Sequence, residues 1–338
     1  MGILDFLFGR TKSSANRFEP EIAQRSNPKP TSEKGISYIG RFASIPSIDF
    51  YGLFKKSPSG EWVICWCDSD ARGGRGGYRA SGHGRYILYN TKLNAVVSQG
   101  ALERPNSADV ADNGVFSIED WHFGDALTGT FYVFSATGQE LIKRRFGANL
   151  FNSALSVNGR YAICQTCNAP SGLDGNRLTA FDVGKGVELF SINPPTGWAS
   201  HYGFDEAMPQ FEVIIKDIGG FVYDEQGAFL DAEKFATARL NCDRFDVVLY
   251  AAEDIINGPD LNDQLALVAL EAATRARLLG ADKDQGWKAL ALKIQGLAHE
   301  FLGSNADALV AFEEALKIDP KIGVKRKAAS LRKKMGGE

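Results

Sequence analysis

Apolar and polar residues alternate with a period of two through much of the chain between about residues 44 and 235. Short alternating runs such as "EWVICWC" and "RYILYN" are separated by turn residues, which is the pattern of antiparallel β-hairpins. After about residue 236 the apolar positions change to the 3.6-residue period of helices. The pattern therefore predicts a β region followed by an α region.

The β region contains a recurring unit. Gly60–Cys65 ("GEWVIC") aligns with Gly159–Cys164 ("GRYAIC"), and each glycine ends a turn, "SPSG" or "SVNG". Between them, "ADNGVFSIED" has the same spacing. The second half of each unit recurs in "GRYILYNTKLNAVV", "GTFYVFSATGQELI", "NRLTAFDVGKGVELF" and "GGFVYDEQGAFLD". We therefore expect four units of roughly 45–54 residues, each made of four short strands.

This repeat resembles the blades of WD-repeat and quinoprotein-like β-propellers, in which a turn S-x-[DN]-G-[RK]-[YW] joins the innermost strand to the second. The Trp-Asp and Gly-His dipeptides of WD repeats are absent. The resemblance covers somewhat over half of the chain and implies a propeller-like domain of about four blades. Because four blades are near the lower limit for closure, a closed ring, an open array and a ring completed by residues 36–42 or by a partner chain all stay open. A two-sheet sandwich is the structural alternative.

The α region is predicted to form helices over residues 235–257, 261–279, 285–302, 306–318 and 321–335. Residues 289–322 resemble one tetratricopeptide repeat through Gly296, Gly303, Ala308, Phe312, Ala315 and Pro320. This resemblance implies that small residues let two helices cross closely and that Phe312 fills the gap between them. His299 stands where the family has an aromatic residue. The last helix would cap the array.

Length and charge limit the class of protein. The chain has 338 residues, enough for two domains, a net charge of −3 and five cysteines, an odd number that favours a reducing compartment. We expect a cytoplasmic, bacterial protein without a transmembrane segment. Its predicted parts are a short apolar segment (1–10), a polar linker (11–35), a β-propeller-like domain (36–235) and a TPR-like α-helical domain (236–338). Contact with a partner, a membrane surface or its own body stays open for Ile3, Leu4, Phe6, Leu7 and Phe8.

A glycine- and arginine-rich stretch, "CDSDARGGRGGYRASGHGRY", follows the second strand of the first unit. A phosphate-binding loop would need a following helix and a Gly-Lys-Ser/Thr motif, but a strand follows here. The stretch is a longer counterpart of Cys167–Arg177 two units later. An RGG-type nucleic-acid segment and a long solvated loop remain alternatives to a partner-binding loop. The predicted partner-binding residues in it are Arg72, Arg75, Tyr78, Arg79, His83 and Arg85.

Chemistry-bearing side chains are few and scattered. Asp68, Asp120 and His122 follow equivalent second strands and are candidates for a metal site or an acid/base pair, with ordinary polar rim residues as the alternative. His201 is a further candidate. The cysteine pairs 65/67 and 164/167 suggest a zinc site, but in an extended strand residues three apart face opposite sides, so Cys164 and Cys167 could not chelate together. Cys65 and Cys164 stand at equivalent core positions of two units, so we expect buried thiols. We expect no metal site, no cofactor and no Ser-His-Asp arrangement.

The sequence favours a non-catalytic protein–protein interaction module: a scaffold, an adaptor or an inhibitor of a partner. The loops 68–85, 123–130 and 168–176 would lie on one rim, and a helical groove around Leu292, His299 and Phe312 would bind a second segment. One alternative is an enzyme or a small-molecule or metal-binding propeller with its site at the funnel. The other is binding of an anionic surface or nucleic acid through Arg72–Arg85 and Lys321–Lys334.

Overall fold

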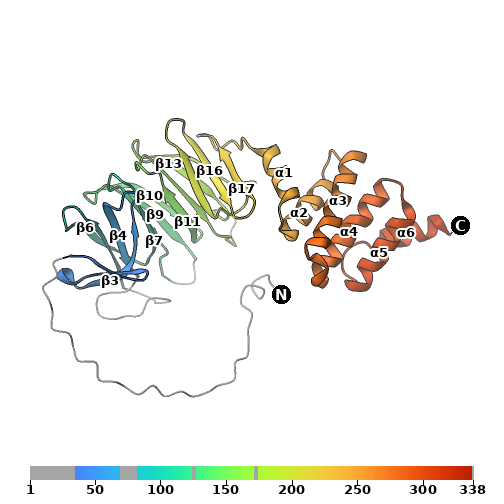
Figure 1. The fold of residues 1–338 in the computed structure, drawn as a ribbon, viewed down its shortest axis with the longest axis horizontal. Coiled ribbons are helices and arrows are strands. Elements are labelled where there is room, and N and C mark those ends of the chain that lie inside the picture. Colours follow the sequence, from blue (N-terminus) through green and yellow to red (C-terminus); the bar gives the residue numbers. More distant parts are fainter. Residues whose placement is uncertain (1–34, 69–81, 124–126, 171–173, 337–338) are drawn as a thin grey trace, which may run out of the picture. The chain divides into compact units, whose positions relative to one another are not determined.

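The computed structural model describes residues 35–68, 82–123, 127–170 and 174–336, and the structural statements below concern these ranges. Within them, seventeen β-strands precede six α-helices (Figure 1). The last strand, β17, ends at Tyr223, and the first helix, α1, begins at Ala232. This order confirms the predicted β region followed by an α region. The domain limits given above stay predictions.

The described strands form four antiparallel sheets that follow one another along the chain. The first sheet contains β1 (Ser37–Ile39), β2 (Phe42–Ile45), β3 (Phe50–Lys56), β4 (Trp62–Cys67), β5 (Gly84–Asn90) and β6 (Ala95–Leu102). The second contains β7 (Pro105–Val110), β8 (Phe116–Asp120), β9 (Gly129–Phe134) and β10 (Glu140–Phe146). The third contains β11 (Leu150–Leu155), β12 (Tyr161–Thr166), β13 (Leu178–Asp182) and β14 (Val187–Ile192). The fourth contains β15 (His201–Asp205), β16 (Gln210–Ile215) and β17 (Gly219–Tyr223), so a two-sheet sandwich is excluded.

The same tight turn joins the first two strands of the first and third repeat units. The N–H of Gly60 donates to the carbonyl of Ser57 (2.8 Å), and the N–H of Gly159 donates to the carbonyl of Ser156 (2.9 Å). Both glycines have a left-handed backbone, with φ of 74° and 72°. A side chain would be strained in that conformation, which explains why each turn ends in glycine. The repeat inferred from the sequence is therefore present in the backbone.

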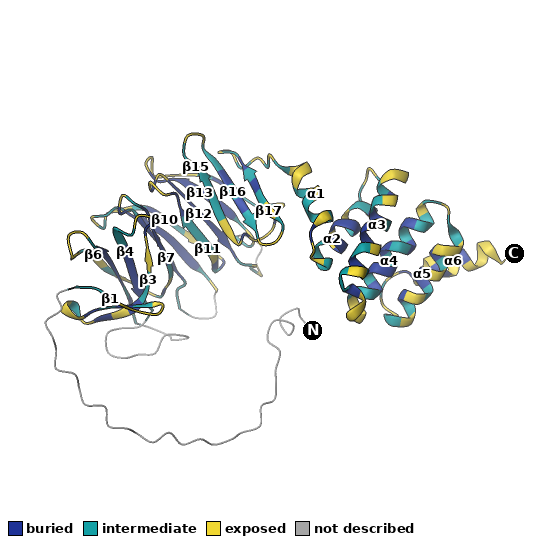
Figure 2. Ribbon diagram, viewed as in Figure 1, coloured by how far each residue is buried: buried dark blue, intermediate teal, exposed yellow. Residues whose placement is uncertain are grey.

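Successive sheets pack face to face, and this packing buries the middle strands on both of their faces. In β9, Tyr132 and Phe134 face the first sheet, whereas Phe131 and Val133 face the third. All residues of β9 and β12 are buried, and Figure 2 shows exposed residues mainly at turns and edges. In β12, Tyr161 and Ile163 pack against the fourth sheet. These core clusters join the first sheet to the second, the second to the third and the third to the fourth.

Each end of this series of sheets is covered differently. On the first sheet, Ala43, Ile45 and Phe50 cover the face of β4 and β5 that points away from the second sheet. Residues 37–45 thus extend the first sheet and do not complete the fourth. Beside β17, a bridge to Phe229 and the ammonium of Lys234, which donates to the carbonyl of Gly220 (2.7 Å), occupy the edge where other sheets have a fourth strand. Among the described residues, no core cluster joins the fourth sheet to the first.

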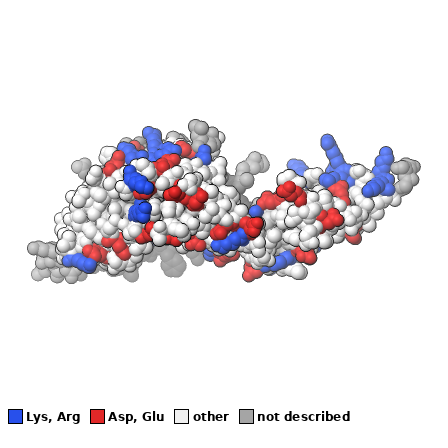
Figure 3. All heavy atoms as spheres, turned by 90° about the horizontal axis from the view of Figure 1, so that it is seen from above, with Lys and Arg blue, Asp and Glu red and all other residues white. Residues whose placement is uncertain are grey.

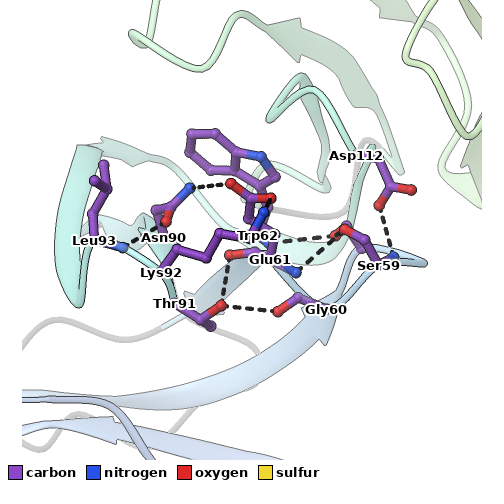
Figure 4. Close-up of polar contacts among 10 residues, drawn as sticks. Ser59, Gly60, Glu61, Trp62, Asn90, Thr91, Lys92, Leu93 and Asp112 are labelled. Carbon is purple, nitrogen blue, oxygen red and sulfur yellow. Dashed lines mark hydrogen bonds and ion pairs between the residues drawn. The ribbon is translucent and has the colours of Figure 1, made fainter.

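The loops on one edge of the sheets tie consecutive repeat units together (Figure 4). The N–H of Ser59 donates to the carboxylate of Asp112 in the next unit (2.8 Å). Two units later, the N–H of Asn158 donates in the same way to the carboxylate of Glu206 (3.0 Å). Between them, the N–H of Asp112 donates to the carbonyl of Val157 (2.8 Å). This edge of the molecule is therefore occupied by contacts that hold the repeat units in place.

The helices are α1 (Ala232–Asn241), α2 (Phe245–Ile256), α3 (Asp263–Leu279), α4 (Gln285–Phe301), α5 (Asn305–Ile318) and α6 (Lys325–Met335). The single helix predicted over residues 235–257 is wrong, because residues 242–244 separate α1 from α2. The guanidinium of Arg275 donates to the carbonyls of Leu240 (3.0 Å) and Cys242 (2.7 Å), which gives the end of α1 its hydrogen-bond partners. The remaining predicted helices agree with α3 to α6 within a few residues.

Helices α4 and α5 cross closely at a glycine. A Cβ atom added at Gly296 would lie 2.5 Å from the ring of Phe312, so only glycine leaves room for that ring. Phe312 is fully buried and belongs to a core formed with α6. Gly296 and Phe312 thus pack as the resemblance implies, whereas assignment to the tetratricopeptide family stays a prediction.

Candidate binding site

A hollow of about 280 Å³ opens at the junction of the first and second repeat units, where β4 ends. We call it the first-unit hollow. In the sequence, its residues 66–68 come immediately before the glycine- and arginine-rich stretch. The hollow lies at the end of β4 opposite the turn that contains Ser59. Its lining residues are Phe42, Tyr51, Gly52, Leu53, Trp66, Cys67, Asp68, Pro105 and Asn106.

The floor of the hollow depends on a glycine and an anchored tryptophan. A Cβ atom at Gly52 would lie 2.3 Å from the carbonyl oxygen of Trp66, so the two strands can approach only because residue 52 has no side chain. The indole N–H of Trp66 donates to the carbonyl of Asn106 in the second unit (3.0 Å). This bond fixes the indole plane and holds the wall formed by the next unit against β4.

Two stacked aromatic rings and a cation lie at one side of the opening. Tyr51 is 55% exposed and stacks on Phe42, with ring centroids 5.2 Å apart and planes inclined by 12°. The guanidinium of Arg41 lies 5.7 Å from the centre of the Phe42 ring. The surface therefore offers stacking area and positive charge together.

The predicted loop residues divide into described and undescribed ones. Arg72, Arg75, Tyr78 and Arg79 lie outside the described residues. His83 is exposed. The guanidinium of Arg85 donates to the carbonyls of Asp49 (3.2 Å) and Ile48 (3.3 Å), so this side chain fastens β5 to the loop after β2. A role for these residues in partner binding stays a prediction.

The predicted helical groove has mostly buried members. Leu292 is 2% exposed and Phe312 is fully buried, so both side chains belong to the helical interior and present no surface to a partner. Only His299, near the end of α4, is partly exposed. The consensus residues by which a helical repeat is recognised in a sequence are the residues that pack its helices together. They are therefore buried and do not mark a binding groove.

The candidate metal and acid/base residues have other roles. The carboxylate of Asp120 accepts hydrogen bonds from the N–H groups of Arg104 (2.6 Å) and Glu103 (3.3 Å). The ring of His122 pairs with the hydroxyls of Thr128 (3.0 Å) and Thr130 (2.8 Å). Asp68 lines the first-unit hollow, and His201 is an exposed residue of β15. Within the part of the chain that the structure describes, no three His, Cys, Asp or Glu side chains are grouped to hold a metal ion.

Desolvation is the main cause of the shifted pKa values of two buried carboxyl groups and of the Cys65 thiol. Burial raises the pKa of Glu119, whose side chain accepts a hydrogen bond from the hydroxyl of Ser153 in the third unit (2.7 Å). Burial also raises the pKa of Asp120. Cys65 and Cys164 are buried free thiols, as predicted, whereas Cys67 and Cys167 are only partly buried. Burial raises the pKa of Cys65 to about 12. Such thiols are poor nucleophiles because the thiolate is hardly populated.

Basic side chains gather on the last helix (Figure 3). Lys327 and Arg332 are paired with Glu300 and with Glu313 (2.8 Å for the second pair). The other basic residues of this helix are exposed: Lys325, Arg326, Lys333 and Lys334. Since a solvated capping helix normally carries such charges, this face alone does not define a binding site.

The aromatic members of the hollow were not identified from the sequence. Phe42, Tyr51 and Trp66 belong to alternating runs, where aromatic residues usually point into a core. One signal was available: in "FYGLF" a glycine sits between aromatic residues inside a predicted strand, which often marks a close backbone approach. Their convergence depends on β2 folding back beside β3, which the sequence pattern did not reveal.

Comparisons with known proteins give no family. No protein-family model and no curated protein matches this sequence. One similar solved structure is that of a mitotic checkpoint complex, with 8% identity, a TM-score of 0.36, and coverage of 65% of this chain and 73% of that one. Another is the computationally designed Ika8 protein, with 13% identity, a TM-score of 0.35, and coverage of 53% and 48%. Likenesses of this size carry no argument about function.

A search of the described helices for a membrane-crossing segment found none of sufficient length and apolar character.

Proposed function

We propose that this chain is a non-catalytic protein-binding module that captures an extended segment of a partner protein at the first-unit hollow. The carrying observation is an exposed, stacked aromatic pair, Tyr51 on Phe42, beside a hollow of about 280 Å³ with a fixed tryptophan wall. Exposed aromatic residues around a preformed pocket are the usual anchors of protein interfaces. On this proposal the sheets form an open propeller-like scaffold, and the TPR-like helices extend it.

The chemistry of the opening suggests the composition of the partner segment. An apolar side chain of the partner fills the hollow between Trp66 and Pro105. An acidic residue beside it faces Arg41, whose guanidinium lies over the Phe42 ring and is exposed. In the sequence, the glycine- and arginine-rich stretch follows Asp68 directly and contains Arg72, Arg75 and Arg79. The positive charges attract an acidic segment of the partner and raise its rate of association.

The test uses the full chain as an affinity bait in an extract of its native cells, with quantitative mass spectrometry of the proteins recovered. We expect the wild type to recover a protein in stoichiometric amount and the Tyr51→Ala variant to lose at least about nine-tenths of it, because truncated aromatic anchors typically cost ~2 kcal/mol or more. The matched control is Tyr250→Ala, which removes a tyrosine of similar exposure (49%) from α2. It should recover the partner normally.

Thermal melts of all three proteins accompany the experiment to show that the variants fold. Loss of the partner with both tyrosine variants would place the binding elsewhere. Equal recovery by Tyr51→Ala and the wild type, or recovery of no stoichiometric protein by either, would contradict the proposal. The anionic-surface alternative predicts a different result: recovery unaffected by Tyr51→Ala but lost steeply as salt is raised.

A further inference from the structure

A second hollow, of about 480 Å³ and different chemistry, lies at the junction of the third and fourth repeat units. It occupies the position equivalent to the first-unit hollow, at the end of β12, and we call it the third-unit hollow. The side chains of its lining that matter here are Gln165, Asn168, Asn176, Asn193 and Trp198. Among the described residues that line it, none carries a charge.

An exposed tryptophan forms one wall of this hollow. Trp198 is 44% exposed and stacks on Phe151 of β11, with ring centroids 5.2 Å apart and planes inclined by 25°. Phe151 is itself exposed. Two flat rings held together at the surface form an apolar platform of the kind that ring-shaped ligands stack against.

The backbone on either side of Trp198 is held by amide side chains. Gln165, fully buried, donates to the carbonyl of Gly197 (2.9 Å) and accepts from the N–H of Ala199 (2.9 Å). The amide of Asn152 donates to the carbonyl of Ala199 (2.7 Å). The hydroxyl of Tyr202 donates to the side-chain oxygen of Asn152 (2.6 Å). Residues 197–199 are therefore fixed from both sides, and the platform is preorganised, which lowers the entropy cost of binding.

Three more amides in the lining have no partner among the described residues. The side chains of Asn168, Asn176 and Asn193 are exposed and make no hydrogen bond to any residue that the structure describes. Asn176 has a left-handed backbone (φ 56°), which places its amide on the turn leading into β13. An amide offers both donors and an acceptor, and so matches groups that also donate and accept, above all hydroxyls.

We propose that the third-unit hollow binds a neutral oligosaccharide. A pyranose ring presents a flat face of C–H groups and a rim of hydroxyls. The C–H face stacks on Trp198, and the hydroxyls pair with the amides of Asn168, Asn176 and Asn193. Within the described part of the lining there is no cation for a phosphate or a carboxylate, which disfavours nucleotides and acidic glycans. This site is separate from the first-unit hollow, so the inference does not depend on the proposed protein partner.

The test is isothermal titration of the full chain with cellohexaose, maltohexaose, chitohexaose and xylohexaose. Ribonuclease B, compared with unglycosylated ribonuclease A, tests the same chemistry on a glycoprotein. We expect at least one probe to bind with a dissociation constant below roughly 1 mM, a typical strength for a shallow site with few ordered contacts. Binding of a free oligosaccharide assigns the site to polysaccharide; binding of ribonuclease B alone assigns it to a protein-linked glycan.

The variants decide whether binding occurs at this hollow. Trp198→Ala should weaken binding at least about tenfold, because it removes the stacking surface. Asn193→Ala should weaken it by a smaller factor, and Tyr51→Ala should leave it unchanged. Phe301→Ala, which removes an aromatic residue of similar exposure (45%) at the end of α4, is the matched control. Raising NaCl from about 50 mM to about 500 mM should not change the affinity, because no ion pair is involved.

Failure of every probe to bind at roughly 5 mM would overturn the inference. Binding that Trp198→Ala and Phe301→Ala weaken equally would also overturn it, since the site would then lie elsewhere. Thermal melts of the variants guard against loss of the fold. Neither negative result would bear on the Tyr51-dependent capture of a protein partner.

Discussion

The first-unit and third-unit hollows occupy equivalent places in the repeat but have walls of different chemistry. At the position after the strand cysteine, the first unit has Trp66 and the third has Gln165. Each donates a hydrogen bond to a backbone carbonyl at the start of the next unit: Trp66 to Asn106 (3.0 Å) and Gln165 to Gly197 (2.9 Å). Equivalent junctions between repeat units are thus closed by an indole in one place and by a side-chain amide in the other.

The difference decides where aromatic surface is exposed. The indole of Trp66 closes the junction and also forms the wall of its hollow. The side-chain amide of Gln165 is buried because its NH₂ group and its oxygen both bond to the backbone of residues 197–199. Trp198, which belongs to that segment, is then the aromatic residue exposed at the surface. In the second unit the equivalent residue is Asp120, which accepts from the backbone instead of donating. One backbone plan therefore supports surfaces of different chemistry.

The largest expected effect comes from removing the buried amide. Gln165→Leu should lower the free energy of unfolding by about 3 kcal/mol, because it leaves the carbonyl of Gly197 and the N–H of Ala199 buried without partners. Urea denaturation of the full chain measures it. Gln99→Leu on the exposed side of β6 is the control and should change stability by less than about 0.5 kcal/mol. Equal midpoints for Gln165→Leu and the wild type would mean that the amide does not hold the junction.

The next effect tests the close strand approach that shapes the first-unit hollow. Gly52→Ala should destabilise the protein by about 1–3 kcal/mol, because the new methyl group overlaps the carbonyl of Trp66 and the ring of Phe50. Gly147→Ala is the matched control, since its Cβ would meet only the carboxylate of Asp174 at 3.4 Å. The measurement is again urea denaturation. If both alanine variants have the same stability, the hollow does not require glycine at its floor.

A smaller effect compares the two ways of closing the junction directly. Trp66→Phe keeps an aromatic ring but loses the N–H···O bond to Asn106, so stability should fall by about 1 kcal/mol, roughly a third of the loss for Gln165→Leu. The same denaturation series gives both values. A loss for Trp66→Phe as large as that for Gln165→Leu would show that packing of the indole, and not its hydrogen bond, closes the first junction.

The repeat itself could be predicted because its signal is local. The glycine of each turn needs a left-handed backbone, and the strand that follows it in the first and third units is mostly apolar. Gly296 and Phe312 were likewise visible, because their spacing reflects direct packing of two neighbouring helices. These features depend on residues close together in the sequence, which is where pattern arguments are strong.

The sites could not be predicted because they form between repeat units. Pro105 and Asn106 reach the first-unit hollow from the strand after the next hairpin, and residues 197–199 reach β12 from the connection to the fourth sheet. The break between α1 and α2 was missed for the same reason: its hydrogen-bond partner, Arg275, lies more than thirty residues away. Tertiary contacts of this kind leave no periodic trace in the chain.

The smallest expected effect concerns the second unit, where a buried carboxyl lies between the two hollows. Burial raises the pKa of Glu119 above its ordinary value near 4.5, although the Ser153 hydroxyl and the charge of Lys55 act in the opposite direction, and Asp109 adds to the rise. The folded state thus holds its proton more tightly than the unfolded state does. Well below pH 4.5, Glu119 is protonated in both states and does not change the free energy of unfolding. As the pH rises from there through the folded pKa, the free energy of unfolding falls. Glu119→Gln keeps an oxygen to accept from Ser153 and carries no charge.

Urea denaturation of the wild type and Glu119→Gln between about pH 4.5 and pH 8 measures this effect. The two should be equally stable at the acid end, and Glu119→Gln should be the more stable at neutral pH, by an amount that grows with pH and then levels off. Asp120, whose pKa is raised by the same cause, leaves part of the pH dependence in the variant. A variant less stable than the wild type at pH 8 would mean that the carboxylate is stabilised by its neighbours, so that the middle junction, like the other two, is closed by a favourable polar contact.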